Sequence, residues 1–336
     1  MADIEKRKIK HIELASLPES QMGGDAFARY RLPYRALPEI SLGNVDTRTE
    51  LLGKTLSQPL IIASMTGGSE HARLINTRLA RAAEKHQVAL GVGSQRIALE
   101  NPEAEATFKL VRELAPTAVI FANMGAVQLN YGRAAEDYQR VVDMIRADAL
   151  YLHVNALQEA IQTEGDTDFS GLLKKIEDLV RKISVPVFVK EVGHGLDAAT
   201  AQKLLECGVA GLDVAGTGGT SWAWIEARRA ENEDFAKWFK DIGAPTDMAL
   251  ADIAALGYDA SLVASGGIRT PIQALKARLL GADYYSAASP FLQAALESDE
   301  KVDELIENWQ KGLAIGLFSM GVSTWQEAKP LKLIEE

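Results

Sequence analysis

The stretch VFVKEVGHGLDAATAQKLLECGVAGLDVAG, residues 187–216, holds one complete strand–helix–strand unit. The runs at 187–192 and 211–216 are short and apolar and end in small or polar residues. Such runs are typical of strands that are buried on both faces of a parallel sheet. Between them Gly208 stands where a glycine commonly ends a helix. The stretch therefore predicts two parallel strands joined by a helix.

The same unit recurs along the chain. Six further strand-like runs lie at 60–64, 89–93, 119–123, 151–155, 262–267 and 284–289. The intervening segments 70–86 and 168–183 each carry one apolar stripe at helical spacing, and Thr270-Pro271 is a favourable helix start. Eight strands alternating with helices predict a (β/α)8 TIM barrel, a fold of about 250 residues. An open doubly wound sheet is the alternative, because alternation does not show closure.

Two segments exceed what a barrel needs. Residues 1–58 form an N-terminal extension before the barrel at 59–336, and no linker divides the chain, so we expect one domain. The interval 217–261 after the sixth strand is long and contains Trp222, Trp224 and Trp238. We expect this elaborated loop to lie over the carboxyl end of the barrel, where lids usually occur.

Composition excludes several classes of protein. Lys and Arg number 36 against 46 Asp and Glu, a formal net charge of −10, which argues against nucleic-acid binding. A single cysteine, Cys207, excludes an internal disulfide framework and Cys-rich zinc sites. The N-terminus is charged where a signal peptide is apolar. The sequence also contains no uninterrupted run of ~18 apolar residues, the length that a membrane-spanning helix needs. These features predict a soluble, cytoplasmic protein.

Polar and small residues gather where the predicted strands end. These ends read SMTGG at 64–68, GSQR at 93–96, NMG at 123–125, NALQE at 155–159, KE at 190–191, GTGGT at 216–220, SGGIR at 265–269 and AAS at 287–289. The catalytic groups of barrel enzymes come from these ends, so the pattern predicts an enzyme.

A phosphate site is predicted at the last strands. Gly266 and Gly267 precede a helix start, with Arg269 beside them, and bare N–H groups at such a place bind anions. The alternative is that these glycines only permit tight turns. The loops GTGGTS and GVGSQR lack the third glycine of a Rossmann fingerprint, which disfavours dinucleotide binding by that route.

Lys190 lies near the end of a strand predicted to be buried. A structural ion pair with Glu191 or Asp213 would explain it, although adjacent strand residues point to opposite faces. A lysine inside the barrel mouth could instead form a Schiff base or stabilise an electron-rich cofactor.

Taken in order, these motifs resemble those of the type 2 isopentenyl-diphosphate isomerases, which are flavin-dependent barrel enzymes. The resemblance covers the whole chain and rests on Arg7-Lys8-x-x-His11, SMTGG, GSQR, HVNALQE at 153–159, VKEVGHG at 189–195, GGTSWAWIEARR at 218–229 and SGGIR. It implies interconversion of isopentenyl and dimethylallyl diphosphate with reduced FMN, Mg²⁺, and NADPH or NADH as reductant. It also implies a homo-oligomer, tetrameric or larger.

The resemblance assigns roles by position. The flavin would be held by Met65, Thr66, Gly67, Ser94, Asn123, Lys190 and Thr220, and its phosphate by Gly266, Gly267, Arg269, Ala287 and Ala288. Substrate contacts would be Arg7, Lys8, Ser94, Gln95, Arg96 and Gln158, and Glu159 would bind the Mg²⁺. Ala215 departs from the serine common in the family, and Thr217 could supply the missing hydroxyl.

Gln158, Glu226 and Trp222 are the candidate catalytic residues. Gln158 and Glu226 could relay protons, and neighbouring tryptophans would raise the pKa of the Glu226 carboxyl by desolvation. Trp222 could stabilise positive charge on the prenyl chain, or it could simply pack beneath the loop. Glu226 could equally be an ordinary first-turn helix residue. We leave His11 and His153 as structural histidines.

Other functions remain open at this point. An FMN-dependent α-hydroxy-acid oxidase needs a His–Arg pair near the seventh strand, and no histidine follows His194. A nucleotide dehydrogenase needs a nucleophilic loop cysteine, whereas Cys207 falls in a predicted helix. A Schiff-base aldolase using Lys190 and a non-catalytic metabolite-binding barrel are the remaining alternatives.

Overall fold

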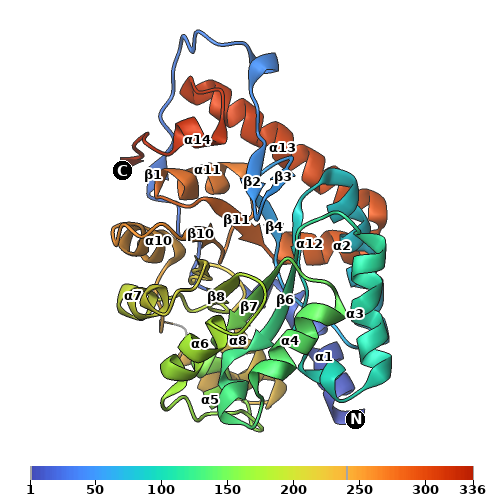
Figure 1. Ribbon diagram of the computed structural model, residues 1–336. Coiled ribbons are helices and arrows are strands. Elements are labelled where there is room, and N and C mark those ends of the chain that lie inside the picture. The colour runs from blue at the N-terminus through green and yellow to red at the C-terminus, as the bar shows by residue number, and fades with distance from the viewer. Residues whose placement is uncertain (1, 240, 336) are drawn as a thin grey trace.

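The computed structural model describes residues 2–239 and 241–335, with the side chains of residues 2–8, 233 and 236 outside the description. Eight parallel strands close into a barrel in the order β10-β11-β4-β5-β6-β7-β8-β9 (Figure 1). Their bounds are β4 (Leu60–Ile62), β5 (Ala89–Gly91), β6 (Ile120–Gly125), β7 (Ala149–His153), β8 (Val187–Lys190), β9 (Gly211–Asp213), β10 (Ser261–Ala264) and β11 (Tyr284–Ala287). The pairing of β11 with β4 closes the sheet, so the TIM-barrel prediction is confirmed and the open sheet is excluded.

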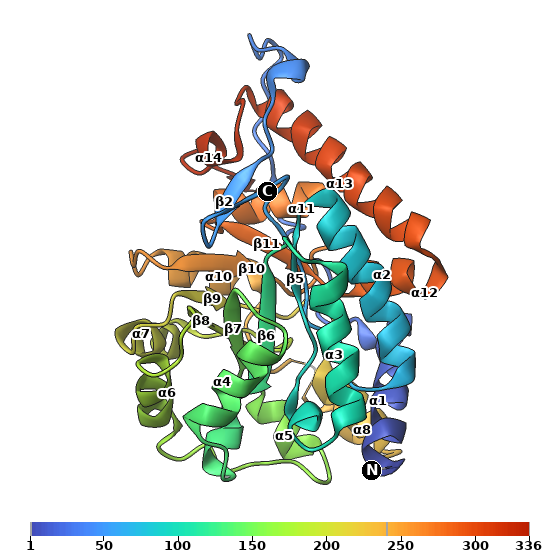
Figure 2. The ribbon, with the colours of Figure 1, turned by 45° about the vertical axis from the view of Figure 1, so that its right-hand side comes forward.

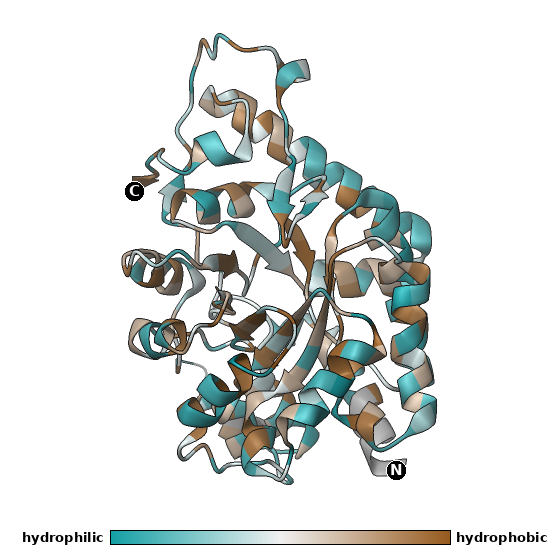
Figure 3. Ribbon diagram, viewed as in Figure 1, coloured by the Kyte–Doolittle hydropathy of each residue, from teal (hydrophilic) through white to brown (hydrophobic). Residues whose placement is uncertain are grey.

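Helices surround the barrel and follow the strands. They include α2 (Glu70–His86), α3 (Pro102–Leu114), α4 (Ala135–Met144), α6 (Leu172–Val180), α7 (Ala198–Glu206), α10 (Thr246–Ala254), α11 (Pro271–Leu279), α12 (Ser289–Glu297), α13 (Asp299–Met320) and α14 (Trp325–Ala328). The hydroxyl of Thr270 caps α11 as predicted, accepting a hydrogen bond from the Gln273 N–H. The predicted helix at 168–183 is shorter, because Gly171 takes a left-handed φ of 63° just before α6. Figure 3 shows the hydrophilic outer faces of these helices around the apolar strands.

Side chains fill the barrel interior near the amino ends of the strands. Phe121 and Tyr151 stack at 4.4 Å, and Phe188 meets the ring of Phe121 edge-on at 5.2 Å. The antiparallel pair β2 (Thr49–Leu51) and β3 (Lys54–Leu56) adds Leu51 and Leu56 to this cluster. The amino end of the barrel is therefore packed, which leaves the carboxyl end for a site.

The N-terminal extension and the loop after β9 meet at the carboxyl end. Helix α1 (Ala2–Ala15) lies beside α8 (Trp222–Arg229), and α8 packs on α5 (Ala156–Ile161), which follows β7 (Figure 2). A further strand of the extension, β1 (Tyr30–Arg31), pairs with β12 (Ile334–Glu335). Helix α9 (Glu233–Lys237) follows α8, and the nearby Trp238 is 74% exposed. Within the described residues, no helix is both long and apolar enough to cross a membrane.

Candidate active site

Two adjoining cavities open at the carboxyl ends of the strands. The larger has a volume of about 240 Å³ and lies between the ends of β4 to β8, α1 and α8, and the smaller, of about 80 Å³, lies at the ends of β9 to β11. They share the residues Lys190, Val192, Thr220, Trp222, Ala288 and Ser289. Together they form one elongated site with two chemically different ends.

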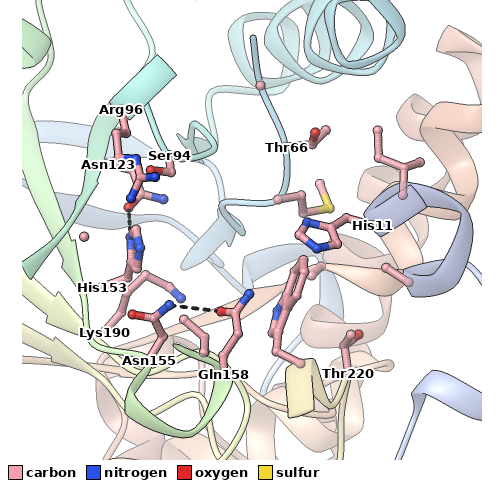
Figure 4. Close-up of a pocket in the computed structure, with 18 of the residues that line it drawn as sticks. His11, Thr66, Ser94, Arg96, Asn123, His153, Asn155, Gln158, Lys190 and Thr220 are labelled. Carbon is pink, nitrogen blue, oxygen red and sulfur yellow. Dashed lines mark hydrogen bonds between the residues drawn. The ribbon is translucent and has the colours of Figure 1, made fainter. Parts of the chain in front are cut away.

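Most of the residues expected from the sequence line this site. The larger cavity has Met65, Thr66, Gly67, Ser94, Arg96, Asn123, Gln158, Glu159, Lys190, Thr220, Trp222 and Ala288 on its wall (Figure 4). The smaller cavity has Gly266, Gly267, Arg269, Ala287 and Ala288, and also Lys190, Thr220 and Trp222. Most residues predicted to hold a flavin ring therefore lie at one end of the site and most of those predicted to hold a phosphate at the other, with Lys190, Thr220 and Ala288 at the junction.

The smaller cavity has the cation Arg269 on its wall, and the buried carboxyl of Asp213, whose charge interacts with that of Lys190, lines the same cavity. Arg269 donates to three neutral acceptors, the carbonyls of Gly267 and Gly218 and the amide oxygen of Gln21. Among the described residues, no Asp or Glu forms an ion pair with it. Helix α12 begins at this cavity without a side-chain cap, which leaves backbone N–H groups at its positive end. This end of the site has the chemistry that binds an anion.

Backbone packing requires glycine at the turn that follows β10. Gly266 and Gly267 have φ values of 95° and 79°. A Cβ at Gly266 would stand 2.1 Å from the carbonyl oxygen of Gly216, and one at Gly267 would stand 2.4 Å from that of Gly218. The two loops after β9 and β10 therefore pack backbone to backbone, and they form the wall of the smaller cavity.

Lys190 lies at the junction of the two cavities. Its Nζ donates to the Glu191 carbonyl at 2.7 Å, while the Glu191 carboxylate accepts N–H groups of the following loop, including those of Gly193 and His194. Burial lowers the pKa of the Lys190 ammonium, and the charges of Asp213 and Glu191 oppose that shift. The two neighbouring side chains point apart, as strand alternation predicts. Lys190 thus presents a buried amine to the site without a side-chain hydrogen bond to Glu191.

His153 presents a neutral ring to the larger cavity. Its Nδ1 lies 2.9 Å from Asn123 Oδ1, and the Asn123 amide nitrogen donates to the Val92 carbonyl, so Nδ1 carries the proton. Burial first, and then the charges of Lys190 and Arg96, lower the pKa of His153 to about 3. The imidazole is therefore neutral near pH 7, with Nε2 as an acceptor.

Glu226 lies behind the cavity wall rather than on it. Its carboxylate is fully buried and accepts hydrogen bonds from Gln158 Nε2 at 3.0 Å and Arg229 Nε at 2.8 Å. His11 Nε2 lies 3.0 Å from the same carboxylate. Burial alone would raise the pKa of Glu226, but these three partners outweigh it and lower the pKa to about 2. The expectation of a raised pKa is therefore wrong, because the partners of Glu226 favour the carboxylate more than the tryptophans disfavour it.

Glu159 and Asn155 place oxygen donors on the cavity wall. Asn155 Nδ2 donates to Glu159 Oε1 at 2.9 Å, and the Asp166 N–H donates to Oε2 at 2.8 Å. Asn155 Oδ1 is buried and has no hydrogen-bond partner in the described structure. Nearby, Arg96 pairs with Asp166 at 2.7 Å. No group of three or more His, Cys, Asp or Glu side chains that could hold a metal occurs among the described residues.

A few expected residues lie away from the cavities. Gln95 is fully buried, and its amide donates to the Val141 carbonyl and accepts from the Asn123 N–H, so its side chain supports the fold. Thr217 lines neither cavity, whereas Ala215 lines the smaller one, so the proposed replacement hydroxyl is not there. Arg7 and Lys8 belong to α1, but their side chains lie outside the described part of the chain.

Comparison with known proteins places the chain in a family. The FMN-dependent dehydrogenase family matches residues 19–113 and 127–335. An isopentenyl-diphosphate delta-isomerase of Synechococcus sp. is 47% identical over 96% of this chain and 94% of its own length. Another, from Ignicoccus hospitalis, is 42% identical over 94% of this chain and 89% of its own length. The chain belongs to the isopentenyl-diphosphate delta-isomerase family.

Solved structures share the fold of this isomerase family at low identity. A flavocytochrome b2 mutant has a TM-score of 0.71 at 19% identity, covering 98% of this chain and 82% of that one. A putative lactate oxidase of Pediococcus acidilactici has a TM-score of 0.70 at 16% identity, covering 100% and 94%. At such identities the likeness concerns the barrel alone.

Sequence reasoning missed several residues that the structure brings to the site, among them two histidines and an asparagine of the larger cavity. His11, His153 and Asn155 all line the larger cavity. Each stands inside a motif on which the resemblance to the isomerase family rests, and that position was the available signal. A histidine is commonly structural, and neither burial nor partners can be read from its neighbours in the chain.

Proposed function

We propose that this chain interconverts isopentenyl diphosphate and dimethylallyl diphosphate, with reduced FMN and Mg²⁺ as cofactors. The observation that carries the proposal is the division of one site into an anion-binding end at Arg269 and a larger chamber at Gln158 and Glu159. Membership of the isomerase family and of the FMN-dependent dehydrogenase family supports the same reading.

The residues present fit FMN. The uncapped start of α12 and the Arg269 guanidinium suit a phosphate, together with Gly266, Gly267, Ala287 and Ala288. Met65, Thr66, Gly67, Ser94, Asn123, Lys190 and Thr220 would surround the ring. When bound, reduced FMN supplies an electron-rich ring and an exchangeable proton next to the substrate. Lys190, buried beside that ring position, would stabilise its negative charge.

The donor set at the other end fits Mg²⁺ with a diphosphate. Mg²⁺ commonly takes one or two protein carboxylates and completes its shell with phosphate oxygens and water. Glu159 supplies a carboxylate, and the unpaired Asn155 Oδ1 is a further oxygen at hand. The diphosphate would also meet Arg96 and, from α1, Arg7 and Lys8. Such local cations are needed because the chain as a whole is acidic.

Proton transfer would fall to Gln158 and the groups behind it. Gln158 Nε2 donates to the ionised Glu226, and Gln158 Oε1 accepts from Asn155 at 3.1 Å, so the amide is held at both ends. Near neutral pH Glu226 is ionised, and it would act in the relay by fixing the Gln158 amide, with His11 beside the same carboxylate. Trp222 stands on the wall shared by both cavities, where its ring can stabilise positive charge on the prenyl chain.

Three expectations complete the proposal. The flavin would be reduced by NADPH or NADH, the protein would act as a homo-oligomer, tetrameric or larger, and it would work in the cytoplasm. No nucleic-acid or membrane partner is expected.

Anaerobic incubation of the purified protein with isopentenyl diphosphate, FMN, Mg²⁺ and NADPH tests the function. We expect dimethylallyl diphosphate as product, with activity lost when either chelator is added or the flavin is kept oxidised. Full turnover under either condition would refute the cofactor assignment. Oxidation of lactate or mandelate without isomerisation would instead favour the α-hydroxy-acid oxidase alternative.

A further inference from the structure

The N-terminal extension also reaches the phosphate end of the site. After α1, residues 20–22 run antiparallel to the loop after β9. The Met22 N–H donates to the Gly219 carbonyl at 2.9 Å, and the Gly218 N–H donates to the Met22 carbonyl at 3.0 Å. Gln21 lies opposite Thr220 in this pairing. The extension therefore forms part of the wall of the smaller cavity, which Gln21 lines.

The side chain of Gln21 bridges two residues of the cofactor site. Its Nε2 donates to Thr220 Oγ1 at 2.8 Å, and its Oε1 accepts from Arg269 Nη2 at 3.1 Å. Thr220 lies at the junction of both cavities, and Arg269 is the cation of the smaller one. The half-buried amide of Gln21 thus contacts both the hydroxyl of Thr220, in the loop after β9, and the guanidinium of Arg269, in the loop after β10.

The acceptors around Arg269 explain why a neutral amide suits this position. Gly218 and Gly267 accept through their carbonyls, so Gln21 supplies the only side-chain acceptor of the Arg269 guanidinium found among the described residues. A carboxylate in its place would neutralise the guanidinium and repel an anion. An amide holds the guanidinium in place and leaves its positive charge available to a ligand.

We infer that Gln21 is a positioning residue for the phosphate of the cofactor, so that the N-terminal extension completes the phosphate end of the site. The inference rests on the proposed binding of FMN. It assigns to the extension a second role besides carrying the expected substrate contacts Arg7 and Lys8. A role confined to the phosphate predicts different effects on FMN and on riboflavin, which has the same ring without the phosphate.

The test compares the dissociation constants of FMN and riboflavin for the full-length protein. Gln21→Met keeps the bulk of the side chain and removes its hydrogen bonds to Thr220 and Arg269, together with one to the neighbouring Ser20. We expect about tenfold weaker FMN binding, the scale of one lost hydrogen bond to a charged group, and a clearly smaller loss for riboflavin, because only Thr220 of the two bridged residues would also meet the ring. Gln21→Glu should weaken FMN binding further, again with a smaller effect on riboflavin. Since it keeps the size and the acceptor for Arg269, it also serves if the Met variant fails to fold.

A matched control comes from another glutamine that contacts the extension. Gln293 donates to the Ser16 carbonyl at 2.9 Å and lines neither cavity, so Gln293→Met should leave the affinities for both flavins unchanged. Equal weakening of FMN and riboflavin in Gln21→Met would show a merely structural role and overturn the inference, as would unchanged FMN binding. If wild type prefers FMN to riboflavin and the variants keep that ratio, only this inference fails. If wild type does not bind FMN, the proposed function fails with it.

Discussion

Gln158 donates a hydrogen bond of 3.0 Å to the fully buried carboxylate of Glu226, which connects the wall of the larger cavity to a charge behind it. His11 and Arg229 contact the same carboxylate, so one buried anion joins α1, α5 and α8. The hydrogen bonds from Gln158 and Arg229, with His11 close by, favour the ionised form of this buried carboxylate. The ionised carboxylate would hold the Gln158 amide in place behind the cavity wall, which is the part we propose for Glu226 in the proton relay.

Glu226→Gln tests that role. We expect kcat to fall by ~10²-fold or more, the scale of a disabled acid–base relay, because the variant keeps the size of the side chain but removes the negative charge that holds Gln158. FMN affinity and Mg²⁺ dependence should stay as in wild type, since Glu226 lines neither cavity. Steady-state kinetics together with the flavin spectrum and the melting temperature check this. Turnover within a few-fold of wild type would leave Glu226 as a structural anchor for α1.

Lys190→Ala should weaken FMN binding and slow turnover more than Lys190→Arg does. The buried cation at the junction of the cavities stabilises negative charge on a reduced ring, and arginine keeps that charge. Removing it should also lower the reduction potential of the bound flavin. Flavin titration and a potential measurement on both variants provide the check. If Lys190→Ala binds FMN and turns over substrate as wild type does, Lys190 serves only to balance the buried charge of Asp213.

Glu159→Gln should raise the Mg²⁺ concentration needed for half-maximal activity by at least tenfold. The substitution removes the negative charge that Mg²⁺ prefers but keeps an oxygen at the same place. FMN binding should not change, because Glu159 is absent from the phosphate end. Asp168→Asn is a control that also removes one carboxylate charge. Asp168 is exposed and accepts a hydrogen bond from the Ser170 N–H. If both variants titrate with Mg²⁺ as wild type does, Glu159 is not a ligand.

His153 makes the protein sensitive to acid. Its pKa is about 3 in the folded protein, below the ordinary value of 6.5, so the unfolded chain binds a proton that the folded protein refuses. The free energy of unfolding should therefore fall as pH drops from about 6.5 toward 3. His153→Gln should flatten this part of the stability curve, measured by denaturant unfolding at several pH values. If the free energies of unfolding of wild type and His153→Gln change with pH in the same way, the His153 imidazole is protonated in the folded protein.

The sequence was enough to predict the barrel and to name many of the residues that line the two cavities. Each of the eight strands ends where small or polar residues begin, and motif positions such as Ser94, Lys190 and Arg269 need only the strand order to be brought together. What could not be predicted depends on packing across the chain. Gln95 follows Ser94 directly, yet its side chain turns into the core.

The protonation state of Glu226 illustrates the same limit. The tryptophans beside it in the sequence suggested an apolar setting and a raised pKa. His11, on α1, and Gln158, on α5, reverse that effect, and both are distant in sequence. Only the folded structure shows that these donors converge on one carboxylate.

The most direct test of the proposed isomerase activity is an anaerobic equilibration started from each isomer separately, with FMN, Mg²⁺ and NADPH present. We expect isopentenyl diphosphate and dimethylallyl diphosphate each to yield the other and to reach the same final ratio. NADPH should be consumed only in reducing the flavin. Failure of either isomer to convert, while the protein is folded and holds reduced flavin, would contradict the proposed activity.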